Sequence, residues 1–132
     1  MIGVDTNVLV RLFVSDDEAQ HQLAKNFFAA RSRNDAAFVS LVVALEFVWV
    51  LTRAFRRKQA EALSLLRIVL TSEDAVVEQA ERLLLAVQLA LETEADFADI
   101  LIGGAGELAG CTTTVTFDRD ASRRISHMEL LA

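Results

Sequence analysis

Two aspartates stand at points in the sequence where a short strand-like segment ends. Asp5 follows the apolar segment 2–4, and Asp118 follows the segment 112–117, which is rich in Thr and also contains Val115. Ligands of open α/β folds bind at the carboxyl ends of strands, so both side chains are candidates for a functional edge. For either aspartate alone, turn formation or helix capping is an equally good explanation. Their recurrence after two strands favours a functional site.

Glu46 lies inside an apolar run that extends from residue 38 to residue 51. Its neighbours at helical spacing, including Val42 and Trp49, are apolar, so we expect little water around its carboxylate. An unpaired buried charge is very unfavourable, so this group should be protonated, ion-paired or bound to a metal. A narrow solvent-facing stripe, or an ion pair with Arg53, is the alternative interpretation.

Asp99 lies near the start of a predicted helix, one helical turn after Asp96. Acidic residues in a first turn complement the positive end of the helix dipole, which explains one member of the pair. Asp99 stands where the apolar face of the helix begins, and dipole complementation explains that position less well. We therefore include it among the candidate site residues.

The combined acidic set is suited to binding hard divalent cations. Carboxylates gathered in one pocket raise one another's pKa values unless counterions neutralise them. Oxygen ligands suit Mg²⁺ or Mn²⁺, which can activate water and stabilise the leaving oxygen of a phosphodiester. No competing nucleophile or zinc motif is present, since His21 and His127 are far apart in sequence and Cys111 is the only cysteine. The candidate metal ligands and catalytic residues are Asp5, Glu46, Asp99 and Asp118.

The elements that would position these residues follow from hydrophobic periodicity and capping signals. Thr6 or Asn7 can cap a helix after the first strand, Ser72 is a good helix start, and Gly110 is a good helix end. Strands are predicted at 2–5, 37–40, 112–117 and 128–131, and further helices at 19–31, 41–53, 59–70, 75–92 and 97–109. Strands separated by helices indicate a parallel sheet covered on both faces.

Length and composition predict one domain over residues 1–132. A hydrophobic content of 53% in 132 residues is sufficient for a core without disulfides. The single cysteine favours a reducing, cytoplasmic setting. The N-terminal segment lacks the pattern of a signal peptide, and the longest apolar run is too short and too interrupted to span a membrane.

The net charge of −6 opposes binding to nucleic acid, because affinity for phosphates depends on Lys and Arg. Cations bound to the carboxylates would mask part of this charge. A local basic cluster can also oppose the global charge, as can the basic residues between 119 and 124. The first of these, the cluster between residues 53 and 58, is weak evidence for RNA or partner contacts. Basic residues at a helix C-terminus also complement the negative end of the helix dipole, which explains the cluster about as well. It consists of Arg53, Arg56, Arg57 and Lys58.

Four motifs, in order, resemble a known family. They are Met-Ile-Gly-Val-Asp-Thr-Asn at 1–7, Ser-Leu-Val-Val-Ala-Leu-Glu at 40–46, Asp-Phe-Ala-Asp at 96–99 and Thr-Phe-Asp at 116–118. Together they resemble the PIN-domain ribonucleases, in particular VapC-type toxins of toxin-antitoxin pairs. The resemblance implies a three-layer α/β fold, with a central, mostly parallel sheet of about four to five strands flanked by helices.

The resemblance also implies an activity and a set of partners. It matches the four acids to a metal-binding quartet, Asn7 and Thr116 to polar residues that support the pocket, and Asp96 to an auxiliary position. It implies Mg²⁺-dependent cleavage of RNA by water, a homodimer, and inhibition by a cognate antitoxin protein. The acidic segment 92–95 departs from many relatives. A non-catalytic interaction module, or an aspartate-based phosphoacceptor or phosphohydrolase, are the alternatives.

Overall fold

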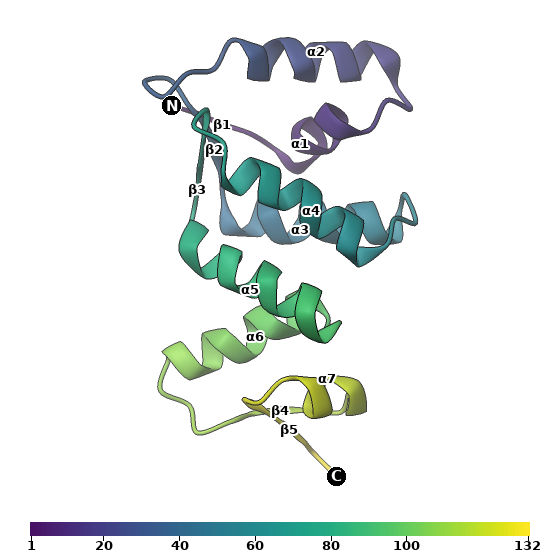
Figure 1. Cartoon of the computed structure of the whole chain (residues 1–132), viewed down its shortest axis with the longest axis vertical. Helices are drawn as coiled ribbons and strands as arrows, with labels where there is room; N and C mark the ends of the chain where they lie inside the picture. The colour runs from purple at the N-terminus through teal and green to yellow at the C-terminus, as the bar shows by residue number, and fades with distance from the viewer. The chain divides into compact units, whose positions relative to one another are not determined.

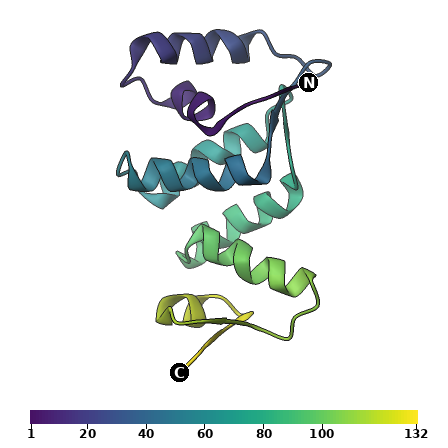
Figure 2. The ribbon, with the colours of Figure 1, turned by 180° about the vertical axis from the view of Figure 1, so that it is seen from behind.

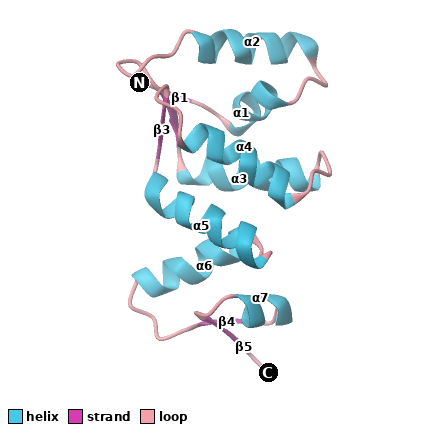
Figure 3. Cartoon of the chain, viewed as in Figure 1, coloured by secondary structure: helices cyan, strands magenta, loops and turns pink.

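The computed structural model describes residues 1–132, which divide into two compact units. The first unit is Met1–Ala80 and the second is Glu81–Ala132 (Figure 1). Seven helices and five short strands alternate along the chain (Figure 3), which confirms the predicted α/β class. None of these helices combines the length and the apolar character required to cross a lipid bilayer.

The first unit contains a three-stranded parallel sheet in the order β1-β2-β3. Helix α1 contacts α2 and α3, and α3 and α4 lie side by side in both views (Figures 1 and 2). The side chains of Leu9, Phe47 and Leu63 are fully buried in its core. The elements are β1 (Ile2–Gly3), α1 (Thr6–Phe13), α2 (Glu18–Ala29), β2 (Ala37–Val39), α3 (Leu41–Arg53), α4 (Gln59–Leu70) and β3 (Ala75–Val77).

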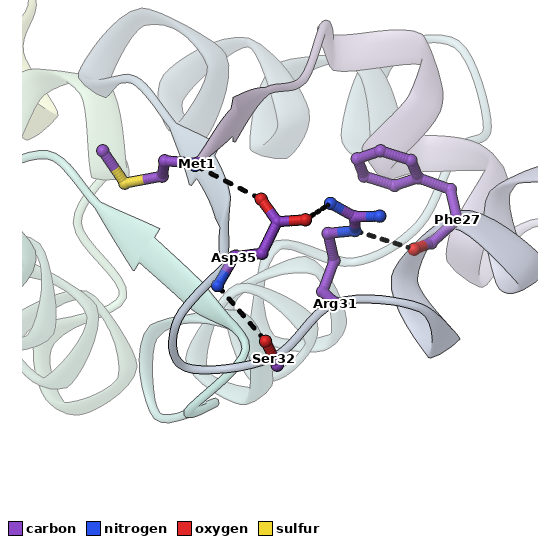
Figure 4. A network of polar contacts seen from close by, with 5 residues as sticks. All are labelled: Met1, Phe27, Arg31, Ser32 and Asp35. Carbon is purple, nitrogen blue, oxygen red and sulfur yellow. Dashed lines mark hydrogen bonds and ion pairs between the residues drawn. The ribbon is translucent and has the colours of Figure 1, made fainter.

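A polar network fixes the start of β1 (Figure 4). The Met1 amine lies 3.3 Å from Asp35 Oδ1, and the Arg31 guanidinium donates to Asp35 Oδ2 at 2.8 Å. Arg31 also donates to the Phe27 carbonyl and lies 4.6 Å from the centre of that ring. The hydrogen bond from the Met1 amine, helped by Arg31, holds the pKa of Asp35 below its ordinary value. The network therefore anchors the strand whose far end leads to Asp5.

Two hydrogen bonds to backbone N–H groups fix the start of α3. The Ser40 hydroxyl accepts from the Val43 N–H at 3.1 Å, as an N-cap does. The Glu78 carboxylate accepts from the Leu41 N–H at 2.7 Å. A negative charge at this end also complements the helix dipole. The bounds of α3 agree with the predicted helix 41–53, and the bonds set the rotation of the helix that carries Glu46.

The second unit contains two parallel strands, β4 and β5, with three helices. The Arg82 guanidinium donates to the Leu101 carbonyl at 2.8 Å and so links α5 to α6. Arg124 donates to the Thr93 carbonyl at 2.7 Å, at the C-terminus of α5. The elements are α5 (Ala80–Thr93), α6 (Phe97–Leu108), β4 (Thr114–Thr116), α7 (Arg119–Arg124) and β5 (Met128–Leu130).

Two glycines shape the turn from α6 to β4. The C-cap of α6 is Ala109, and Gly110 follows it with a φ of 87°, a left-handed conformation that suits glycine. Gly106 lies against Thr114, because a β-carbon at Gly106 would overlap the Thr114 hydroxyl. The close approach of α6 to β4 therefore depends on the absence of a side chain at residue 106.

The structure corrects several expectations. The predicted helix 75–92 is wrong in its first part, because Ala75–Val77 is strand β3 and the helix begins at Ala80. Ser72 consequently caps no helix, and its hydroxyl accepts from the Asp74 N–H within a turn. Helix α7 was not predicted. The prediction of parallel strands is confirmed, since all pairings are parallel in the three-stranded sheet of the first unit and in the strand pair of the second.

Candidate active site

Asp5 ends the segment that begins with β1 and is also the N-cap of α1. Its Oδ1 atom accepts a hydrogen bond of 2.8 Å from the Thr6 N–H. The prediction that Thr6 or Asn7 caps this helix is therefore wrong, because the carboxylate itself performs that role. A cap uses one carboxylate oxygen, so Asp5 retains a second oxygen that can bind a cation. Both Asp5 and Asn7 are exposed in their unit.

Thr6 connects Asp5 to Glu46 within the first unit. It is the buried polar residue of the core, with 6% of its surface exposed. Its hydroxyl donates a short hydrogen bond to Glu46 Oε1, across the contact between α1 and α3. The backbone N–H of Thr6 meanwhile binds Asp5. Two of the four predicted site residues are thus bonded to the same residue, Asp5 through the backbone of Thr6 and Glu46 through its side chain.

The expectation that Glu46 is buried is wrong for this unit, where its side chain is exposed. The residues one turn away on the same face, Val42 and Trp49, are themselves 70% and 59% exposed. Helix α3 instead buries the face that carries Phe47 and Leu51. The alternative of a solvent-facing stripe describes Glu46 better, although its carboxylate binds Thr6 rather than Arg53.

Three predicted acids lie near one another in the second unit. Asp96 is the N-cap of α6, and its Oδ1 accepts from the Asp99 N–H at 3.0 Å. Asp118 is the N-cap of α7 and accepts from the Ala121 N–H at 3.0 Å. Its own N–H donates to the hydroxyl of Thr116 at 3.0 Å, which makes Thr116 a support for this carboxylate.

The surroundings of Asp99, which include Asp96 and Asp118, shift its pKa. Burial raises the pKa of Asp99 above its ordinary value, and the charges of Asp96 and Asp118 raise it further. The side chain is half-buried, whereas those of Asp96 and Asp118 are exposed. Ionisation of Asp99 is therefore opposed both by lost hydration and by two like charges.

No basic side chain neutralises these acids within their own units. None of Asp5, Glu46, Asp96, Asp99 and Asp118 takes part in an ion pair there with Lys, Arg or His. Within neither unit do three or more Asp, Glu, His or Cys side chains converge closely enough to hold a metal ion. The donors are oxygens, the type that Mg²⁺ and Mn²⁺ prefer, so their chemistry fits these cations.

The basic cluster lies at the connection between α3 and α4. Arg53 is in the last turn of α3, and Lys58 is the residue before α4. Arg57 lies 3.9 Å from Glu61, an ion pair too exposed to contribute much stability. Arg56 has a φ of 53°. All four basic side chains are exposed, so a role in RNA or partner contacts stays a prediction.

Sequence reasoning missed the role of Thr6, although the sequence carries a signal for it. Thr6 stands three and four residues before Leu9 and Val10, which are buried in α1. A polar residue on the apolar face of a helix is itself buried and requires a hydrogen-bond partner. Because the periodicity does not identify that partner, the bond to Glu46 emerges only from the structure.

Comparison with protein families gives a match over most of the chain. The family model described as PIN domain matches residues 2–126, which is most of the chain and includes residues of both units. Among curated proteins, none matches this chain. The matched range contains three of the four motifs noted in the sequence in full, and all of the first motif except Met1.

Proposed function

Because the chain belongs to the PIN domain family, we propose that it is an endoribonuclease that depends on a divalent cation. PIN domains are generally nucleases, so hydrolysis of phosphodiester bonds is the activity that the family supplies. One observation carries the finer proposal. Burial and the charges of Asp96 and Asp118 oppose ionisation of Asp99, and none of these three acids forms an ion pair within the second unit. A bound cation is the simplest counterion.

The proposal gives each acid a role. Asp5, Glu46 and Asp99 hold the principal cation, and Asp118 helps to bind a second ion or orients the attacking water. When bound, Mg²⁺ or Mn²⁺ activates that water and polarises the phosphate oxygens. Asn7 and Thr116 support the pocket, and Asp96 acts as an auxiliary acid.

The four sequence motifs, and not the arrangement of the side chains, support a role in a toxin-antitoxin pair. We propose that the protein is the VapC-type toxin of a toxin-antitoxin pair, that it forms a homodimer, and that a cognate antitoxin inhibits it. We also place it in the cytoplasm, where its RNA substrate is found. The exposed thiol of Cys111 supports a reducing compartment, because an exposed free cysteine is readily oxidised elsewhere.

Removal of the metal tests the proposal. RNA incubated with the parent protein and Mg²⁺ should be cleaved internally, and EDTA should stop cleavage, because a water without a cation is a poor nucleophile. Added Mg²⁺ or Mn²⁺ should restore it. Asp5→Asn should lose more than about a hundredfold in cleavage rate, beyond the roughly 10- to 100-fold typical of residues that only support metal ligands. Asparagine is as good an N-cap as aspartate, so α1 should persist.

Glu18→Gln is the matched control, because it removes one exposed carboxylate at the start of α2. This variant should cleave RNA as the parent does. Cleavage that resists EDTA, or that survives in Asp5→Asn, would contradict the proposal. Stable binding of a phosphate mimic such as beryllium fluoride without RNA cleavage would favour the phosphoacceptor. No response to metal in any assay would favour the interaction module.

A further inference from the structure

A groove in the first unit extends from Asp5 and Asn7 along helices α1 and α2. Its volume is about 560 Å³, within the range of roughly 300–1,000 Å³ typical of small-molecule sites. It is formed by the end of β1 and by helices α1 and α2, and we name it the α1–α2 groove. Its lining includes Asp5, Asn7, Arg11, Gln20, Leu23 and Phe27.

The lining combines an apolar wall with a few polar groups. Leu23 contributes an apolar side chain that is 69% exposed, and the half-buried Phe27 extends this wall. Gln20 accepts a hydrogen bond of 2.9 Å from Arg11 through its amide oxygen, which leaves its two N–H donors available to a ligand. Asn7 contributes a second exposed amide near Asp5. Amides read the edges of nucleobases well.

Arg11, the basic residue of the groove, is already engaged. It donates to Asp16 at 2.6 Å as well as to Gln20, and its guanidinium lies 5.9 Å from the centre of the Phe55 ring. With one committed guanidinium and the Asp5 carboxylate at the rim, the groove is poorly suited to an anionic group. It suits an uncharged ligand that has an apolar face and a polar edge.

We propose that the α1–α2 groove receives a nucleobase of the RNA strand, next to the phosphate held at Asp5. This inference rests on the proposed ribonuclease function. Unpaired bases of RNA are recognised by contact with apolar or aromatic side chains and by hydrogen bonds to their edges. A base contact also compensates for the net charge of −6, which deprives the protein of the usual attraction to phosphates.

Nucleotide binding tests the inference without requiring cleavage. The four nucleoside 5′-monophosphates are titrated into the full chain while the side-chain amide resonances of Asn7 and Gln20 are followed by NMR. At least one nucleotide should shift both resonances, and ribose 5-phosphate, which lacks a base, should not. Leu23→Glu should weaken binding about tenfold, because it places a carboxylate in the apolar wall.

Gln22→Glu is the matched control, because it adds the same charge one residue away on α2, at an exposed position that does not line the groove. It should bind nucleotides as the parent does. Equal shifts with ribose 5-phosphate, or none with any nucleotide, would overturn the inference. A dimer that Leu23→Glu dissociates in sedimentation, with no response to nucleotides, would instead assign the groove to contacts between two copies.

Cleavage kinetics give a second measurement. Once the cut site of an RNA is mapped, an abasic nucleotide beside the cut should lower kcat/KM of the parent about tenfold. Leu23→Glu should show no further loss on the abasic RNA, because both changes remove the same contact. Additive losses would overturn the inference. If the protein bound nucleotides but cut no RNA, the proposed function would fail while the groove would still be a base site.

Discussion

Replacement of Asp99 by asparagine is expected to abolish metal-dependent cleavage and yet leave the metal-free protein at least as stable as the parent. The loss of activity follows if Asp99 holds the principal cation, because an amide oxygen lacks the charge that binds it. We expect a fall in kcat of more than about a hundredfold, larger than the roughly 10- to 100-fold seen for outer-sphere partners. Steady-state cleavage of a fluorescent RNA measures it.

The expected gain in stability follows from the pKa of Asp99. Because burial and the charges of Asp96 and Asp118 raise that pKa in the folded state, the folded protein binds this proton more tightly than the unfolded chain does. The contribution to stability is therefore fully present below the unfolded pKa. It is lost as pH rises through the folded value. At neutral pH, Asp99 should destabilise the metal-free protein, and asparagine should remove that penalty.

Urea unfolding at pH 4 and pH 7 in EDTA measures this effect. The parent should lose more stability between the two pH values than Asp99→Asn does. Glu107→Gln is the control, because it removes one exposed carboxylate from the same helix without affecting the acidic group. Saturating Mg²⁺ should raise the melting temperature of the parent and of the control but not of Asp99→Asn. A parallel fall of activity and stability in Asp99→Asn would contradict this account.

Replacement of Thr6 by valine is expected to lower RNA cleavage about 10- to 100-fold with little change in stability. Valine has nearly the shape of threonine and fills the same buried position in α1, but it cannot donate to Glu46. The Glu46 carboxylate is exposed, so water can replace the lost donor and limit the cost in folding. What is lost is the fixed orientation of the carboxylate.

Thr6→Ser separates positioning from packing. Serine keeps the hydroxyl and loses a methyl group, so it should restore cleavage while lowering the melting temperature slightly. The concentration of Mg²⁺ that gives half-maximal cleavage should rise in Thr6→Val and return towards the parent value in Thr6→Ser. If cleavage followed the melting temperature in both variants, Thr6 would be a packing residue only.

The sequence predicted which secondary-structure elements carry the candidate acids better than it predicted the burial and contacts of their side chains. Strands that end near Asp5 and Asp118 were predicted from short apolar or β-branched segments, and the bounds of α3 and α4 agree with the predicted helices. The three acids at 96, 99 and 118 lie near enough for two of them to raise the pKa of the third. The gathering of all four predicted ligands at one cation stays a prediction.

Two of the sequence predictions failed because tertiary contacts, and not the local pattern, decide the outcome. Helix α3 is apolar on nearly every side, so periodicity did not indicate which face is buried, and Glu46 was assigned to the wrong one. The segment 75–92 has no Gly or Pro to separate its parts. The break occurs at Gln79, which adopts a φ of 55°. Glutamine does not indicate a turn as Gly or Pro does, so the sequence does not predict this break. Strand β3 is formed by pairing with β2, a contact that no local pattern reveals.

The approach of α6 to β4 has a consequence for how the sequence can drift over evolutionary time. A β-carbon at residue 106 would overlap the Thr114 hydroxyl, so residue 106 cannot gain a side chain while that hydroxyl keeps its position. A methyl group at residue 106 becomes tolerable once residue 114 lacks a hydroxyl or adopts another rotamer. Homologues should therefore show correlated changes at these two positions, while Gly3, whose missing β-carbon faces open space, should vary independently of any partner.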